Sequence, residues 1–148
     1  REHVSLVLDC LRAFMNNDVG LKEIMEMPTA IEQLAFALTF TRDAERIKIL
    51  ELLTVVCWED ERGLQSVLDA LAAPQFGRRF QVLLEMMTRG ENLQLKNQTL
   101  TFCNVLINAP AALDTRIFIR QEFLDLGVLD AIEVRPGHTP RSAHHSSH

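Results

Sequence analysis

The sequence has few of the residues that indicate nucleic-acid binding or a disulfide-stabilised fold. Its 148 residues include no tyrosine, one tryptophan and three cysteines, and the formal net charge is −5. Phosphate binding needs clustered cations, and base stacking needs aromatic side chains. The cysteines (Cys10, Cys57 and Cys103) are widely spaced and lie among apolar neighbours. We therefore predict no nucleic-acid partner, and three reduced, buried cysteines in a cytoplasmic protein.

Long apolar runs and the common catalytic motifs are also missing. No uninterrupted apolar stretch approaches the roughly 20 residues of a membrane-spanning helix, and no signal peptide follows Arg1. We expect a piece of a longer protein that does not span a membrane. The glycines are isolated, and no phosphate loop, His-x-x-x-His or Cys-x-x-Cys motif precedes the tail. The prediction is a non-enzyme without cofactor or metal; an unrecognised enzyme site would need perturbed titratable groups in a closed pocket.

What the sequence does contain is a helical pattern over most of its length. Apolar residues recur at steps of three and four, and no stretch alternates as a strand does. This predicts an all-α domain of eight or nine helices over residues 1–133 and a disordered, His-rich tail over residues 134–148. The first expected helix ends near Asn16, the third starts at a Thr29 cap with Glu32 in a capping box, and the fourth starts at Thr41 or Asp43. The other expected helices are Leu21–Met27, Leu64–Leu71, Phe80–Met87, Leu93–Asn108 and Asp114–Leu126.

The chain also repeats itself. Leu8–Met25 aligns with Leu50–Leu68, so that Phe14 meets Val56 and Gly20 meets Gly63, and a fainter third copy follows. The displacement falls in the range of about 40–47 residues that is typical of armadillo and HEAT units. Such units stack because one unit cannot bury its apolar side alone. We therefore predict an armadillo-like, right-handed superhelix with a concave face.

Two polar stripes and one aromatic residue are candidates for a binding surface. Asn97, Thr101, Asn104 and Asn108 share one face of the predicted 93–108 helix, and Ser5, Asp9, Arg12 and Asn16 share a face of the first helix. These stripes are either solvated surface or ligand-facing amides and charges. Trp58 precedes the acidic run Glu59-Asp60-Glu61. It is either a core residue or an exposed anchor for an amphipathic helix, and the acidic run is either solvated charge or a lip that attracts the basic extension of such a helix.

Three segments carry a resemblance to a known family. CLRAFMNNDVGLKEIME (Cys10–Glu26), LELLTVVCW (Leu50–Trp58) and LDTRIFIRQEFLDLGVLDAI (Leu113–Ile132) resemble segments of the diaphanous-type formins, in the order found in that family. The resemblance implies the armadillo-repeat inhibitory region within the formin homology 3 segment. In that family its groove binds an amphipathic autoregulatory helix from the C-terminus of the same protein. This docking holds the actin-assembling domain inactive, and a GTP-loaded Rho-family GTPase releases it.

The resemblance and the acidic lip together give a set of partner-binding residues. They are Asn16, Leu21, Val55, Trp58, Glu59, Thr101 and Asn104. The family usually has alanine at the position of Val55 and an aliphatic residue at that of Trp58. We expect the GTPase-binding subdomain to precede Arg1, actin to be reached only through other domains of the parent protein, and the protein to act at the cytoskeleton and cell cortex. The alternatives are a helical-repeat scaffold for an unrelated peptide or protein, and a solenoid that reads RNA with a regular code.

Overall fold

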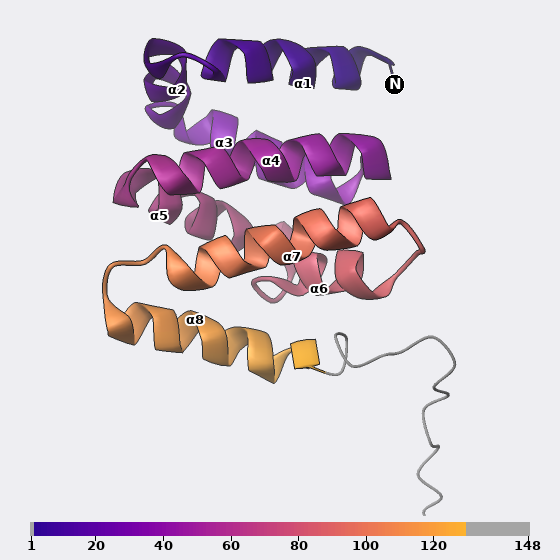
Figure 1. The fold of residues 1–148 in the computed structure, drawn as a ribbon, viewed down its shortest axis with the longest axis vertical. Coiled ribbons are helices and arrows are strands. Elements are labelled where there is room, and N and C mark those ends of the chain that lie inside the picture. Colours follow the sequence, from indigo (N-terminus) through magenta and orange to yellow (C-terminus); the bar gives the residue numbers. More distant parts are fainter. Residues whose placement is uncertain (1, 130–148) are drawn as a thin grey trace, which may run out of the picture.

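The computed structural model describes residues 2–129, and these form helices without a strand (Figure 1). The all-α prediction is thus confirmed for this part, and the predicted tail at 134–148 lies outside the described residues. The helices are α1 (Glu2–Met15), α2 (Asp18–Met25), α3 (Pro28–Phe36), α4 (Asp43–Glu59), α5 (Glu61–Leu71), α6 (Gln81–Thr88), α7 (Leu93–Asn108) and α8 (Leu113–Asp125), with the 3-10 helices η1 (Ala37–Thr39) and η2 (Pro74–Phe76).

The three long helices α1, α4 and α7 are stacked side by side, and α8 continues the stack beyond α7 (Figure 1). Two shorter helices separate each long helix from the next: α2 and α3 come before α4, and α5 and α6 come before α7. One unit therefore consists of two short helices followed by a long one, which is the arrangement of an armadillo-like repeat.

The same glycine corner joins each long helix to the next short one. Asn17 accepts a hydrogen bond from the Gly20 amide at 2.8 Å, and Asp60 accepts one from the Gly63 amide at 2.8 Å. A Cβ on Gly20 would lie 1.9 Å from the Phe14 carbonyl oxygen, and one on Gly63 would lie 2.3 Å from the Val56 oxygen. Only glycine permits this approach, so the pairing of Gly20 with Gly63 in the sequence repeat has a structural cause.

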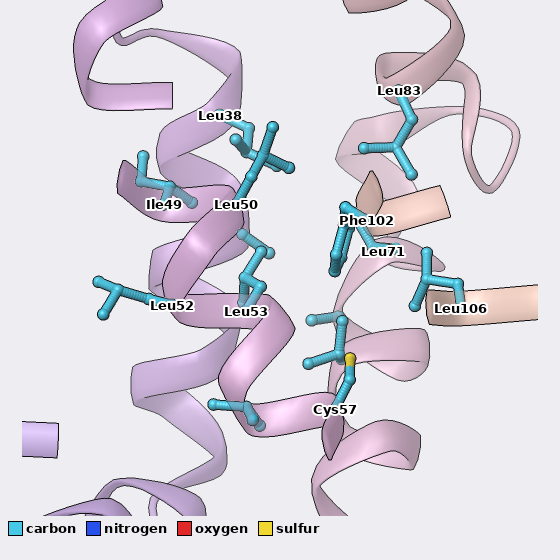
Figure 2. Packing of buried hydrophobic residues seen from close by; sticks show 14 of the residues in the cluster. Leu38, Ile49, Leu50, Leu52, Leu53, Cys57, Leu71, Leu83, Phe102 and Leu106 are labelled. Carbon is cyan, nitrogen blue, oxygen red and sulfur yellow. The ribbon is translucent and has the colours of Figure 1, made fainter. Parts of the chain in front are cut away.

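The core is centred on α4, which is covered by neighbouring helices on several sides. Figure 2 shows Leu50, Leu53 and Cys57 of α4 among buried side chains of other helices. Burial raises the pKa of the Cys57 and Cys103 thiols to about 12. The prediction of three buried cysteines is wrong for Cys10, which is exposed because it lies on a face of α1 that no described helix covers.

An aromatic and ionic contact attaches α8 to the segment before α6. The rings of Phe80 and Phe123 stack with centroids 4.4 Å apart, and Arg79 Nε donates to a Glu122 carboxylate oxygen at 2.8 Å. Phe80 adopts a left-handed backbone with φ of 71°. It therefore precedes α6 as its N-cap, whereas the sequence pattern predicts it as the first residue of the helix.

Candidate protein-interaction surface

The exposed side chains of the long helices form the candidate surface. On α4, the residues at steps of three and four (Lys48, Glu51, Val55 and Trp58) lie on one side of the helix. The equivalent stripe on α7 contains Asn97, Thr101 and Asn104. The helix α4 packs against both α1 and α7, and ion pairs link the α1 stripe to the α4 stripe. The surface is charged between α1 and the start of α4, apolar toward the end of α4, and rich in amide and hydroxyl groups on α7.

Ion pairs connect the stripe on α1 to the start of the stripe on α4. Lys48 Nζ lies 2.8 Å from Asp9 Oδ1 and donates to Ser5 Oγ at 2.8 Å, and Arg12 pairs with Glu51. We call these five residues the charge ladder. Its charges neutralise one another, so this part of the surface carries little net field toward a partner.

The second half of the α4 stripe is apolar and uncovered. Val55 is 43% exposed and Trp58 is 66% exposed, so neither is a core residue. An exposed tryptophan beside an exposed valine is the kind of anchor that recurs at the centre of protein interfaces. Of the two interpretations of Trp58 left open by the sequence, the structure supports the exposed one.

The α7 stripe offers amide and hydroxyl groups. Thr101 Oγ1 donates to the Asn97 carbonyl at 2.9 Å, and Asn108 Nδ2 donates to the Asn104 carbonyl at 2.9 Å. Within residues 2–129, no hydrogen bond of the Asn104 side-chain amide is formed, and that side chain is exposed. It can therefore donate to and accept from a partner backbone.

The structure places most of the predicted partner-binding residues on the surface but not Leu21. Asn16, at the end of α1, and Glu59, at the end of α4, are exposed. Leu21 is only 6% exposed and belongs to the core. We therefore define the docking face as Asn16, Val55, Trp58, Thr101 and Asn104. Leu21 is assigned to the core and not to this face.

The acidic run lies at the end of the α4 stripe. Asp60 is the N-cap of α5, and Glu59 and Glu61 flank it. A cavity of about 170 Å³ lies here, lined by Cys57, Trp58, Asp60, Glu61, Leu64 and Ala109. The sequence predicts Glu59 as part of the surface, yet it is Asp60 and Glu61 that line the cavity. Both belong to the acidic run Glu59-Asp60-Glu61, for which the sequence leaves open solvated charge or an acidic lip.

Residues 2–129 contain no group of three or more His, Cys, Asp and Glu residues arranged to hold a metal ion. In the same part of the chain, no helix has the length and apolarity needed to cross a membrane.

Stacked three-helix units with an exposed mixed surface along their long helices define a helical-repeat interaction domain. Residues 2–58 match the family model described as the Diaphanous GTPase-binding Domain, and residues 63–136 match the Diaphanous FH3 Domain. The chain belongs to the diaphanous-related formins and is part of their N-terminal regulatory region. The armadillo-like fold and the family resemblance predicted from the sequence are both confirmed.

Named relatives agree with this assignment. The chain is 32% identical over 144 residues to Disheveled-associated activator of morphogenesis 2 of Mus musculus, covering 90% of the chain and 13% of that protein. It is 34% identical over 126 residues to Protein diaphanous homolog 2 of Homo sapiens (82% and 11%), and 29% identical over 137 residues to Formin-F of Dictyostelium discoideum (88% and 11%). The chain thus spans only 11–13% of the length of these curated relatives.

The two family matches divide the chain near its middle. The sequence predicts a single armadillo region over residues 1–133, and the family resemblance implies a GTPase-binding subdomain before Arg1. Residues 2–58, which contain α1 to α4 up to Trp58, match the GTPase-binding model. The boundary between the two matches falls at the Asp60–Gly63 corner, where one repeat ends and the next begins.

Proposed function

We propose that this domain holds its parent formin inactive by binding an amphipathic autoregulatory helix from the C-terminus of the same protein. The observation that carries the proposal is the exposure of Val55 and Trp58 on α4 beside the amide stripe of α7. The apolar side of the helix packs on Val55 and Trp58. Asn16, Thr101 and Asn104 hydrogen-bond its backbone and polar edge, and Glu59 attracts its basic extension.

Regulation by a GTP-loaded Rho-family GTPase follows from shared surface. The match of residues 2–58 to a GTPase-binding model includes α1 and nearly all of α4, and these helices also carry part of the docking face. A GTPase that contacts them competes with the autoregulatory helix or changes the position of its contacts. Tethering raises the effective concentration of the helix, so even a moderate intrinsic affinity keeps the parent protein closed until the GTPase binds.

The cellular role follows from the parent protein. Release of the autoregulatory helix frees the actin-assembling domain, and this chain reaches actin only through that domain. We therefore place its action in the cytoplasm, at the actin cytoskeleton and the cell cortex. The chain itself contributes recognition and no catalysis.

The proposal is tested by measuring fluorescence anisotropy of a labelled autoregulatory peptide of the same formin, titrated with this chain. Val55→Asp places a carboxylate under the apolar side of the helix and should weaken binding at least 30-fold, or about 2 kcal/mol. Val19→Asp is the matched control, because Val19 is 72% exposed on α2 and lies outside the docking face. Its affinity should equal that of the wild type.

Two results would contradict the proposal. One is unchanged affinity of Val55→Asp, and the other is an equal loss with Val19→Asp, which would indicate a nonspecific charge effect. Capture of an unrelated peptide at the docking face, with no binding of the autoregulatory peptide, would favour the general scaffold alternative.

A further inference from the structure

The helix α8 lies at the end of the described stack and is attached to it by few side chains (Figure 1). Within α8 only Ile119 and Phe123 are buried. Three apolar side chains of the same helix are more than half exposed, namely Leu113, Ile117 and Phe118. The neighbouring helix α7, against which α8 packs, buries six residues. The attachment of α8 therefore depends on a small set of contacts.

Two consecutive residues of α8 contact two consecutive residues that precede α6. The rings of Phe80 and Phe123 stack with their planes 8° apart, and both side chains are almost completely buried. The guanidinium of Arg79 donates to the Glu122 carboxylate and lies 4.9 Å from the centroid of the Phe80 ring. We call these four residues the latch.

The two halves of the latch differ in how far water reaches them. The side chains of Arg79 and Glu122 are 23% and 24% exposed, and a hollow of about 260 Å³ lies beside their ion pair. An ion pair that water reaches contributes little free energy, whereas a buried aromatic pair contributes through both area and geometry. The stack of Phe80 on Phe123 is therefore the main contact of the latch.

The latch also contains a strained backbone position. Phe80 has φ of 71° and ψ of −4°, and no other residue among 2–129 except glycine has a positive φ. A bulky side chain rarely adopts this conformation and keeps it only where its surroundings hold it there. Because the ring of Phe123 stacks on that of Phe80, the contact that docks α8 also helps to hold Phe80 in the left-handed region.

The conformation of Phe80 determines in turn how α6 begins. The Phe80 carbonyl oxygen accepts hydrogen bonds from the amides of Leu83 and Leu84, each at 3.1 Å. A change in the backbone angles of Phe80 would turn this carbonyl away from both amides. The docking of α8 and the first turn of α6 are therefore coupled through one residue.

We propose that α8 opens and closes as a unit while the rest of the domain stays folded, and that its opening frees Phe80 to leave the left-handed conformation. Relief of the strain at Phe80 favours the open state, so α8 should open at a lower free energy than the whole domain unfolds. Any contact that favours one state of α8 also changes the surroundings of α7, the helix that carries Thr101 and Asn104. The latch is thus a conformational device, and it does not rest on the proposed function.

Hydrogen exchange of the complete chain, followed by NMR, tests this proposal because it detects openings too rare for other methods. The amides in the interior of α8 should exchange at least tenfold faster than those of α4 and α7. The amides of Leu83 and Leu84 should exchange at the rate of α8 and not at that of the later residues of α6, because they depend on Phe80.

A matched pair of substitutions separates the latch from the general properties of α8. Phe123→Ala removes the stack and should raise the exchange rates of α8 and of Leu83 and Leu84 at least tenfold, with a change of less than twofold in α4. Phe118→Ala is the control, because it makes the same change on the same helix at a side chain that is 63% exposed. It should leave the exchange rates of Leu83 and Leu84 unchanged and those of α8 within twofold.

A milder pair tests the ionic half and keeps the test decisive if Phe123→Ala does not fold. Arg79→Gln removes the ion pair with Glu122 and should raise the same exchange rates two- to fivefold. Arg78→Gln changes the adjacent, exposed arginine and should leave them as in the wild type.

Four results would overturn the proposal. The first is exchange of α8 at the rate of α4, which would show that α8 does not open separately. The second is an equal rise throughout the chain in Phe123→Ala or Arg79→Gln, which would indicate global unfolding. The third is an equal effect of either control variant. The fourth is faster exchange of α8 without any change at Leu83 and Leu84, which would show that the opening does not involve Phe80.

Discussion

The charge ladder and the docking face occupy neighbouring parts of one surface. The charged side chains of the ladder pair with one another, whereas the apolar side chains of the docking face are exposed to solvent. In the ladder, Asp9 is paired with Lys48 and Arg12 with Glu51. In the docking face, Val55 and Trp58 leave much of their apolar surface exposed to solvent. Exposed ion pairs contribute only about 0–1 kcal/mol to stability, whereas covering exposed apolar area is favourable at roughly 25 cal/mol/Å². A partner therefore gains more binding free energy by covering the exposed apolar side chains of the docking face than by contacting the ion pairs of the ladder.

The two regions nevertheless share a backbone arrangement. Gly20 follows α1 as Gly63 follows α4, and each lies against the carbonyl of the preceding long helix. The difference between the regions is thus one of side chains on a repeated frame. On this repeated backbone, the side chains of one unit can form ion pairs with one another while those of the next unit stay exposed for recognition, without a change of fold.

The largest expected effect on stability comes from substituting the glycines of the two repeated corners. Gly20→Ala and Gly63→Ala would each place a Cβ within 2.3 Å of a backbone oxygen that a side-chain rotation cannot move away. Each should lower the free energy of unfolding by about 3 kcal/mol. Urea denaturation followed by circular dichroism measures it.

Gly90→Ala is the control for these two variants. Gly90 has φ of 76°, but a Cβ attached to it would meet no atom within 4 Å. The substitution should cost only about 1–2 kcal/mol, from backbone strain alone. A loss in Gly63→Ala no larger than that in Gly90→Ala would show that the two regions do not depend on a shared close approach.

A second prediction contrasts the buried side of α4 with the outer face of α1. Burial raises the pKa of Cys57 to about 12, so the thiol stays protonated in the folded chain after it has ionised in the unfolded one. The unfolded state then binds fewer protons, and stability falls as pH rises from about 8.5 toward 12. At pH 10 Cys57 should account for a loss of about 2 kcal/mol relative to neutral pH.

Urea denaturation at pH 7 and pH 10 checks this contribution. Cys57→Ala should lose less stability between these two pH values than the wild type does. Cys10→Ala removes an exposed thiol instead and should keep the wild-type difference. An identical difference in all three proteins would show that Cys57 is not protected from ionisation by the packing around α4.

The helices and their repeat could be predicted because they depend on local patterns. Apolar steps of three and four indicate the helices, and the recurrence of Gly20 as Gly63 indicates the unit. The exceptions lie at helix ends. Thr29 is predicted to cap a helix, but Pro28 already occupies its first turn and Met27 is the N-cap. Proline fits the first turn because its missing N–H is not needed there.

The surface could be predicted only in part, because periodicity identifies a face but not what covers it. Leu21 and Val55 are both apolar residues on helices, yet Leu21 of α2, a helix that packs against α1 and α3, is in the core while Val55 remains exposed. Cys10 shows the opposite error, an apolar position left uncovered. The ladder pair Arg12–Glu51 could not be predicted, because it depends on the register between α1 and α4.

The smallest expected effect comes from the charge ladder. Lys48→Met removes the partner of Asp9 while keeping most of the aliphatic stem. It should lower the free energy of unfolding by at most about 1 kcal/mol, and less in high salt, because exposed pairs are weak and screened. Binding of the autoregulatory peptide should change less than twofold, because Lys48 lies outside the docking face. A loss of affinity as large as that of Val55→Asp would mean that the ladder is itself a contact site, and the contrast between the two regions would not hold.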